Sequence, residues 1–213
     1  VAVTTVNDAP TAIAPTSGSV STYDSADFTA ATLATTDADD TTWTYTIQSV
    51  SHNTLGAVTN TNGAVFDLGT TGSSSTTGEA ATATLRAVNP SGLTAGTYTV
   101  NVRADDGGAS GTFDQEVTIT VSDTLVVTVA AIDSNVPAGS YAADLADGGG
   151  LDLREALALA AGGNKTIGFA AGLNNATITL GGTYTVAAGT VFDADTVGTL
   201  TISGQTLSLA GAF

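Results

Sequence analysis

Aspartate pairs in turn-like segments are the residues of this sequence whose types and spacing best suit a chemical role. Asp37 and Asp39 stand two positions apart in the segment TTDADD, and Asp105 follows the strand-like run TVNVRA. Carboxylates at i and i+2 of one loop can turn toward the same ion, and Ca²⁺ takes about 6–8 oxygen ligands at about 2.3–2.6 Å. The sequence therefore predicts a hard-cation site with Ca²⁺ as its cofactor. The candidate metal ligands are Asp8, Asp37, Asp39, Asp105, Asp106 and Asp123.

A second interpretation of the same residues stays open, because Asp is also a common turn former. Its side chain accepts hydrogen bonds from backbone N–H groups about two residues further along the chain. Under this interpretation Asp37, Asp39 and Asp105 only shape the loops in which they lie. Asp24 is a further candidate ligand to which both interpretations apply.

Catalytic chemistry finds little support among the other residues. The chain contains one His, His52 in the polar segment SVSHNT, and no Cys. A serine-type triad needs a His base with partners, and zinc needs several His or Cys ligands. We therefore expect His52 to be a solvated loop residue, and the sequence predicts no catalytic residue.

The charge of the chain argues against whole classes of partner. Only four Lys and Arg residues stand against 20 Asp and Glu, which gives a formal net charge of -16. Nucleic-acid binding and docking on anionic lipid both require clusters of Lys and Arg, so neither is expected. No window approaches the roughly 20 apolar residues that span a bilayer, so no membrane insertion is expected. Excess carboxylate favours solubility and divalent cations.

The elements that would position the aspartates are β-strands over residues 8–123. Runs at 43–50, 83–87, 97–104 and 116–122 alternate Thr and other polar residues with apolar ones at period two. Turn-rich segments separate these runs, and Asn62-Gly63 is typical of a hairpin turn. The pattern predicts an all-β fold that begins with an antiparallel sandwich.

Residues 124–213 show a different pattern. One strand at the start of this segment precedes the only convincing helix, at about 152–161, in which Asp152 and Glu155 form a capping box. Short apolar strands separated by Gly or Asn follow the helix. They predict the first rungs of a parallel solenoid, whose interior is filled by stacked Ile, Val and Leu.

The opening segment VAVTTVND is similar to VTITVSD at 117–123. If the later segment ends the sandwich, the earlier one ends a preceding copy. Residues 1–7 would then be the end of a preceding repeat or its linker. The match predicts a parent protein built as a tandem array, in which neighbouring repeats are partners of this one.

The first module resembles the cadherin-like repeats of large bacterial surface adhesins. The resemblance rests on VNDAPT at 6–11, ATTDADDTTWTYTI at 34–47, LTAGTYTVNVRADDGG at 93–108 and TITVSD at 118–123. It implies a Greek-key, Ig-like sandwich with Ca²⁺ at the ends of the repeat, which stiffens a rod. Thr5 stands where the family often has an acidic residue, and residues 85–90 lack the family's Glu-bearing motif. One or two ions are therefore expected in place of a full cluster.

The second module resembles the start of right-handed parallel β-helix domains in large bacterial secreted proteins. The matching segments are VVTVAAID at 126–133, LDLREALALA at 151–160, KTIGFA at 165–170 and ATITLGG at 176–182. The resemblance implies that the helix at 152–161 caps the first rung. Arg154 and Glu155 would anchor this cap, and a catalytic Arg-Glu pair is the alternative use of them.

Together these features predict a structural or adhesive segment of a long secreted or bacterial cell-surface protein, not an enzyme. It would be stiffened by Ca²⁺, with homopolymeric fibre assembly and a glycan or cell-surface target as candidate interactions. One alternative is the binding module and β-helix start of a polysaccharide-degrading enzyme. Asp193 and Asp195 would be its paired carboxylates if TVFDAD is a strand. A surface-lattice protein is the other alternative.

Overall fold

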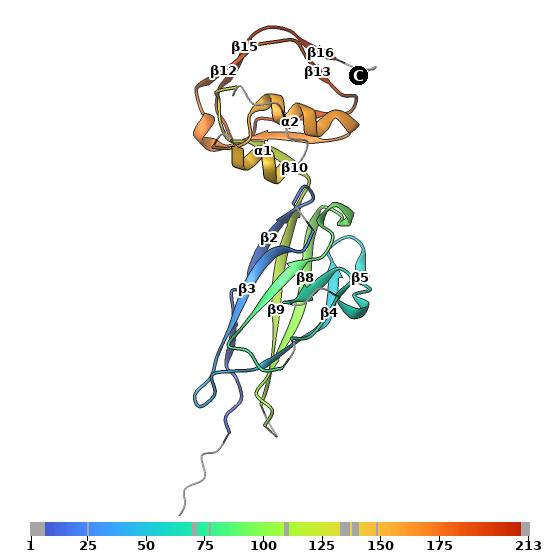
Figure 1. Ribbon diagram of the computed structural model, residues 1–213, viewed down its shortest axis with the longest axis vertical. Helices are drawn as coiled ribbons and strands as arrows, with labels where there is room; N and C mark the ends of the chain where they lie inside the picture. Colours follow the sequence, from blue (N-terminus) through green and yellow to red (C-terminus); the bar gives the residue numbers. More distant parts are fainter. Residues whose placement is uncertain are drawn as a thin grey trace, which may run out of the picture. The chain divides into compact units, whose positions relative to one another are not determined.

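The chain forms two compact units, Val1–Ser122 and Asp123–Phe213, and β-strands dominate both (Figure 1). The computed structural model describes residues 7–24, 26–69, 72–76, 78–108, 111–132, 137, 141–147 and 149–209. The division lies one residue before the boundary expected from the sequence. Of the expected linker at 1–7, only Asn7 is among the described residues.

The first unit consists of two sheets. The four-stranded sheet is antiparallel and has the order β1 (Ala12–Ala14), β3 (Phe28–Thr36), β7 (Thr82–Ala87), β6 (Phe66–Leu68). The five-stranded sheet has the order β2 (Ser17–Ser21), β9 (Thr112–Ser122), β8 (Gly96–Asp105), β4 (Thr44–His52), β5 (Gly56–Val58). Its strands pair antiparallel except for β2 and β9, which run parallel.

Alternation of side chains along these strands builds one apolar core between the two sheets. In β8, Tyr98, Val100 and Val102 are buried, whereas the residues between them are only half-buried. Buried residues of both sheets belong to one cluster, to which β7 contributes Leu85 and β9 contributes Ile119. The runs predicted as strands at 43–50, 83–87, 97–104 and 116–122 coincide with β4, β7, β8 and β9. The first unit is therefore a β-sandwich, and the period-two pattern predicts four of its described strands, β4, β7, β8 and β9.

The expectation of a solvated His52 is wrong. His52 ends β4 and is only 3% exposed, and its Nδ1 accepts hydrogen bonds from the N–H groups of Thr54 and Leu55, both at 3.3 Å. Its ring packs against Tyr98, with 4.5 Å between the ring centroids. The turn between β4 and β5 thus folds back on the ring, and a polar sequence context does not reveal this.

The turn at Asn62-Gly63 forms but does not make a hairpin. Both residues have positive φ, 54° and 68°, as the dipeptide predicts. However, the turn leads from β5 to β6, which lie in different sheets. Asn62-Gly63 therefore carries the chain from one layer of the sandwich to the other.

The described part of the second unit contains three small parallel sheets. β10 (Thr124–Val127), β11 (Thr166–Phe169) and β14 (Val191–Asp193) form one of them. β12 (Ala176–Leu180) pairs with β15 (Leu200–Gly204), and β13 (Tyr184–Val186) pairs with β16 (Leu207–Leu209). From β11 onward, successive strands belong to each of the three sheets in turn, and this order then repeats. Paired residues such as Ala176 and Leu200 are therefore separated by a nearly constant number of residues along the chain.

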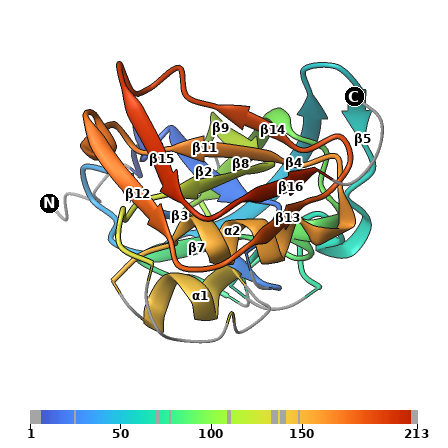
Figure 2. The same cartoon turned by 90° about the horizontal axis from the view of Figure 1, so that it is seen from above.

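Among the described residues, two short α-helices accompany these sheets (Figure 2). α2 (Leu153–Leu159) begins at the predicted capping box: Asp152 Oδ1 accepts from Glu155 N at 2.9 Å, and Glu155 Oε2 accepts from Asp152 N at 2.8 Å. A 3₁₀ turn, Ala160–Gly162, completes the predicted span. α2 packs against β10 and β13.

The sequence does not predict the other helix, α1 (Tyr141–Asp147), which has seven residues like α2, because the Asp-x-x-Glu pair that marks the start of α2 has no counterpart in the segment YAADLAD. No helix within the described ranges has both the length and the apolar character needed to cross a bilayer.

Candidate metal centre

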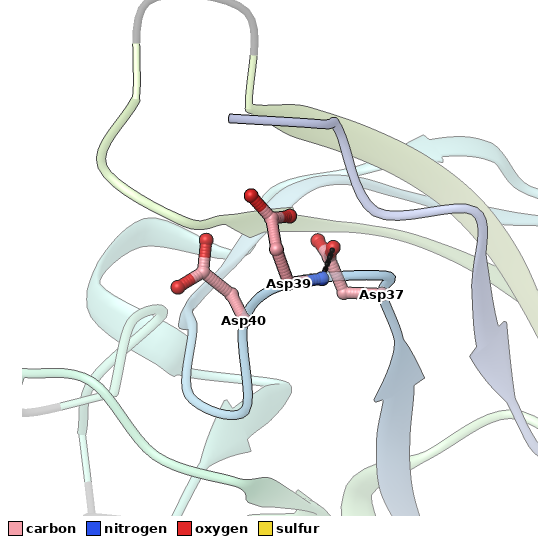
Figure 3. A group of neighbouring side chains, drawn as sticks. All are labelled: Asp37, Asp39 and Asp40. Atoms are coloured by element: carbon pink, nitrogen blue, oxygen red, sulfur yellow. Dashed lines mark hydrogen bonds between the residues drawn. The ribbon is translucent and has the colours of Figure 1, made fainter. Parts of the chain in front are cut away.

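Three aspartates come together in the loop between β3 and β4. Asp37, Asp39 and Asp40 each offer a carboxylate oxygen, and these oxygens all lie within 4.8 Å of one another. Figure 3 shows Asp37 and Asp39 close together on the same stretch of loop, with Asp40 beside them. Asp39 is exposed and the other two are half-buried. The predicted pair is thus joined by Asp40, which the i, i+2 spacing did not single out.

Asp37 shapes this loop with one of its oxygens. Its Oδ1 accepts hydrogen bonds from the N–H groups of Ala38 and Asp39, at 2.5 and 3.2 Å. Its Oδ2 is buried and accepts no hydrogen bond with acceptable geometry, although the Trp43 indole N–H lies near it. The turn-forming role is therefore real for Asp37, and it occupies only half of the carboxylate.

The pKa values of Asp37 and Asp39 shift in opposite directions. Burial raises the pKa of the Asp37 carboxyl, but hydrogen bonds from the backbone N–H groups of Asp39 and Ala38 outweigh it, so the pKa is lowered. Burial also raises the pKa of Asp39, together with its hydrogen bond to Asp37 and the charges of Asp40 and Asp37, so this pKa is raised. The charges of the neighbouring carboxylates contribute to the raised pKa of Asp39, because like charges at this distance repel. A divalent cation would relieve the same repulsion.

Two consecutive residues connect this loop to the loop that follows β8. Asn7 Nδ2 donates to Asp106 Oδ2 at 3.0 Å, and the Asp8 N–H donates to Asp39 Oδ1 at 3.4 Å. The segment before β1 therefore lies between the two acidic loops. Asp8 and Asp106, both predicted as ligands, are at the same end of the sandwich as the cluster.

The loop after β8 is shaped by its own aspartates. Asp105 Oδ1 accepts from Gly107 N at 2.8 Å, and Asp106 Oδ1 accepts from Gly108 N at 2.7 Å. Asp105 does not belong to the group of oxygens within 4.8 Å. The expectation that topology brings Asp105 to this end of the sandwich agrees with its position at the end of β8, whereas its role as a ligand stays a prediction.

Glu79 is a carboxylate that the sequence did not single out. Its Oε2 accepts from Thr42 Oγ1 at 3.0 Å, and a Cβ atom placed on Gly107 would lie 3.8 Å from its Oε1. Glu79 thus reaches from a turn-rich segment to the same end of the sandwich. No spacing relates it to the predicted ligands, so only the fold reveals it.

Asp123 and Asp24 lie at the opposite end of the sandwich. Asp105 is paired with Thr112 at the start of β9, whereas Asp123 follows the last residue of that strand. Eleven residues of strand at about 3.3 Å each separate the two ends by roughly 35 Å. Asp24 follows β2, which runs parallel to the end of β9, and its Oδ2 accepts from Ser21 N at 2.7 Å. Neither residue can share an ion with Asp37 in this unit.

The cations of the first unit are engaged elsewhere. Arg103 pairs with Asp114 at 2.7 Å, and Arg86 pairs with Asp67 at 2.8 Å. Within the described part of the chain, no ion pair involves Asp37, Asp39 or Asp40. The negative charge of the cluster is therefore not compensated by these side chains.

The carboxylates proposed for the enzyme alternative are not arranged as a pair on one strand. Asp193 is the last residue of β14, and Asp195 lies in the turn beyond it, where its N–H donates to Asp193 Oδ1 at 3.0 Å. Both are exposed. Asp193 therefore forms a turn, which is the commoner use of such a residue.

Arg154 and Glu155 are occupied within the helix cap. Glu155 is fully buried in the capping box, and an Arg154 guanidinium nitrogen lies 3.8 Å from Asp152 Oδ2. This arrangement fits the anchoring role that the sequence suggested for both residues.

The chain as a whole matches no protein-family model and no curated protein.

Proposed function

We propose that this chain is a Ca²⁺-stiffened structural or adhesive segment of a secreted or bacterial cell-surface protein. The observation that carries the proposal is the set of carboxylate oxygens from Asp37, Asp39 and Asp40 within 4.8 Å of one another. Carboxylates are the ligands that hard cations prefer. Burial and the hydrogen bond to Asp37 raise the pKa of Asp39, and the charges of Asp40 and Asp37 add to this; an ion there would offset those charges.

The strand order of the first unit supports a cadherin-like, Greek-key sandwich. The order β1-β3-β7-β6 corresponds to the A, B, E and D strands of Ig-like folds. The run β9-β8-β4 in the other sheet corresponds to the G, F and C strands. The proposal assigns the first unit to this architecture.

The pairing in the second unit supports the start of a parallel β-helix. Each circuit of the chain through three sheets places a new strand beside its predecessor in parallel register, as in β11 and β14. Successive rungs that bury a shared interior are the hallmark of a solenoid. α2 packs against β10, the first strand of its sheet, where a cap is needed.

The position of the site suggests how an ion would act mechanically. Asn7 and Asp8 already connect the segment before β1 to both acidic loops through hydrogen bonds. An ion shared by these loops would fix this segment to the sandwich. If a neighbouring repeat precedes it in the parent protein, the joint between the repeats would become stiff, as a spacer that presents a glycan-binding or cell-surface-binding partner requires.

Addition of Ca²⁺ is expected to stabilise the first unit. Extracellular modules bind Ca²⁺ with Kd values of about 10⁻⁴–10⁻³ M, so about 10 mM CaCl₂ should raise Tm by about 5 °C relative to EGTA. Trp43 is the only Trp in the chain and is buried in the first unit. Its fluorescence during thermal unfolding therefore reports on this unit alone.

Matched variants separate a specific site from a general effect of salt. Asp37→Asn and Asp39→Asn should abolish the Ca²⁺-dependent rise in Tm, whereas Asp114→Asn, which removes one charge outside the cluster, should retain it. Mg²⁺ at the same concentration should act more weakly, because it demands near-octahedral geometry. A Tm for the unaltered chain that is the same in CaCl₂ and EGTA would refute the proposal.

Acid is expected to weaken the Ca²⁺ effect earlier than ordinary aspartates would require. The raised pKa of Asp39, caused by burial, its bond to Asp37 and nearby charges, means that it takes up a proton above the ordinary value of about 3.9. That proton competes with the cation. In the cation-free protein, the effect of acid on stability has the opposite sign. Because the pKa of Asp39 is raised in the folded state, protonation of Asp39 favours the folded state, and its contribution to stability grows as pH falls through that pKa.

The measurement is the difference in Tm between CaCl₂ and EGTA as a function of pH. The difference should shrink as pH falls from neutrality, before the ordinary aspartate value of about 3.9 is reached. If it stays constant down to that value, Asp39 is not a ligand.

A further inference from the structure

One edge of β4 has two separate partners, and they leave a gap between them. β8 pairs with β4 along the opposite edge. On the edge with the gap, β5 pairs with Val50–His52, whereas Thr46 forms an isolated bridge with Ser75. Among the described residues, none is paired with Gln48 or Ser49 on this side. The outer edge of β4 is therefore interrupted over two residues.

A β-bulge lies at the same place. The register between β4 and β8 shifts between Ile47 and Ser49, so that Gln48 is one extra residue of β4. A bulge bends its strand and changes the direction of its side chains, and bulges are common beside active sites. Gln48 and Ser49 are both exposed. The bulge therefore presents two neighbouring polar side chains at the interrupted edge.

The interrupted edge contains a recess of about 330 Å³. Its volume lies near the lower limit of the range of about 300–1,000 Å³ that is typical of ligand pockets. Residues 47–50 of β4 and 57–58 of β5 line the recess together with Asn60 and Ser74. None of these described residues is charged, although the chain carries 20 Asp and Glu. The recess therefore suits a small uncharged ligand.

Three polar side chains of the recess are available to such a ligand. Within the described part of the chain, the side chains of Gln48, Ser49 and Ser74 form no hydrogen bond. The amide of Gln48 and the two hydroxyls can each donate and accept hydrogen bonds. The recess therefore favours a ligand that offers both donors and acceptors within a small volume.

Asn60 adds a polar group whose orientation is already fixed. Its Oδ1 accepts from the N–H groups of Val65 and Phe66 at 2.8 and 3.0 Å, and its Nδ2 donates to Phe66 O at 2.9 Å. A carboxamide nitrogen carries two hydrogens, so these bonds leave one of them for a ligand. This donor would lose little conformational freedom on binding.

A neutral hexose unit meets these requirements better than the other ligand classes. Its hydroxyls donate and accept hydrogen bonds, and it needs no opposite charge from the protein. An apolar ligand would leave the amide and hydroxyl groups of the recess unpaired, which costs free energy when they lose water. A peptide that adds a strand to a sheet forms a run of main-chain hydrogen bonds, and an interruption of two residues is too short for such a run.

We propose that the recess at the bulge of β4 binds one neutral hexose unit of a glycan. Its hydrogen-bonding groups are the side chains of Gln48, Ser49, Asn60 and Ser74. This inference rests on the adhesive part of the proposed function and gives it a binding site within the sandwich itself. A single sugar ring makes few contacts, so the expected Kd is about 1 mM.

The test follows the amide signals of the isotope-labelled full chain by NMR. The methyl glycosides of glucose, galactose and mannose are added separately to about 50 mM, well above the expected Kd. At least one of them should shift the backbone amides of Gln48, Ser49 and Ser74 and the side-chain amide of Asn60, with saturation. If none of the three shifts these amides, or if the shifts lie elsewhere in the chain, the proposal is overturned.

Matched variants show whether the recess itself binds the sugar. Gln48→Ala combined with Ser49→Ala removes two exposed side chains, so the fold should persist while Kd rises about ten-fold or more, because two hydrogen-bonding partners are lost. Ser51→Ala changes an exposed hydroxyl of β4 outside the recess and should leave Kd unchanged. An unchanged Kd in the double variant would also overturn the proposal.

The titration is carried out in CaCl₂ and in EGTA, so that this inference and the proposed ion can fail separately. Glycoside binding together with a Tm that does not respond to Ca²⁺ would support the recess and refute the ion. A Tm that responds to Ca²⁺ without glycoside binding would refute the recess alone.

Discussion

Replacement of Asp67 by Ala is expected to destabilise the sandwich by about 3 kcal/mol or more. Asp67 lies in β6 with a fully buried side chain and binds Arg86 of β7 through both oxygens, at 2.9 Å from Nε and 2.8 Å from a terminal nitrogen. The Gly72 N–H donates to the same carboxylate at 3.1 Å. The variant would leave the guanidinium of Arg86, whose side chain is only 16% exposed, without its main partner.

The hydrogen bond from Arg86 to Asp67 raises the pKa of Arg86, so this guanidinium remains charged at any accessible pH. The cost therefore cannot be avoided by loss of a proton. Urea unfolding followed by Trp43 fluorescence measures the free energy of unfolding of this unit. Asp67→Asn should recover part of the loss, because the amide oxygen can still accept from Arg86.

Asp114→Ala is the matched control for this variant. Asp114 also binds an arginine through both oxygens, at 2.7 and 2.8 Å from Arg103, but both side chains are about 40% exposed, at 39% and 43%. Exposed ion pairs contribute little to stability. If Asp114→Ala proved as destabilising as Asp67→Ala, burial would not be the reason for the strength of the Asp67 pair.

The contrast between these two pairs illustrates what the sequence can predict. The period-two runs predict β4, β7, β8 and β9, because alternation along one strand is a local property of the chain. The pairing of Asp67 with Arg86 depends instead on how β6 and β7 meet in register. A charged residue inside a short strand gave no sign of burial, and neither did His52 in its polar segment.

The candidate site likewise combines features that are local in the sequence with features that only the fold creates. The i, i+2 spacing of Asp37 and Asp39 is local, and the structure places their oxygens together. The sequence placed Asp8 and Asp123 at the two joints of the first module, each after a strand-like run. β9 carries Asp123 to the opposite end of the sandwich from Asp105. Glu79 reaches the acidic end from a turn-rich segment, and no spacing in the sequence relates it to the predicted ligands.

In the second unit the capping box predicted the start of α2, because Asp152 and Glu155 satisfy each other within one turn. The short strands predicted rungs of a parallel solenoid; the structure pairs β11 with β14, β12 with β15 and β13 with β16 in parallel, and the assignment to a β-helix stays a proposal. How deeply each inward-facing apolar side chain of the second unit is buried depends on the strands packed around it, and no local pattern in the sequence specifies these.

Ile178→Ala is therefore expected to destabilise the second unit far more than Ile202→Ala. Both residues occupy the same inward position in paired strands, but Ile178 is fully buried and Ile202 is 36% exposed. Removing a buried Ile side chain leaves a cavity and costs about 2–5 kcal/mol, whereas a site open to solvent fills with water and loses only part of this.

Calorimetry of the full chain measures the two units separately if Trp43 fluorescence is used to assign the transition of the sandwich. The Ile178→Ala variant should lower the Tm of the other transition by about 8 °C or more, with the sandwich transition unchanged. Ile202→Ala should lower it by less than half as much. Equal losses would mean that Ile202 is as well covered as Ile178 in solution.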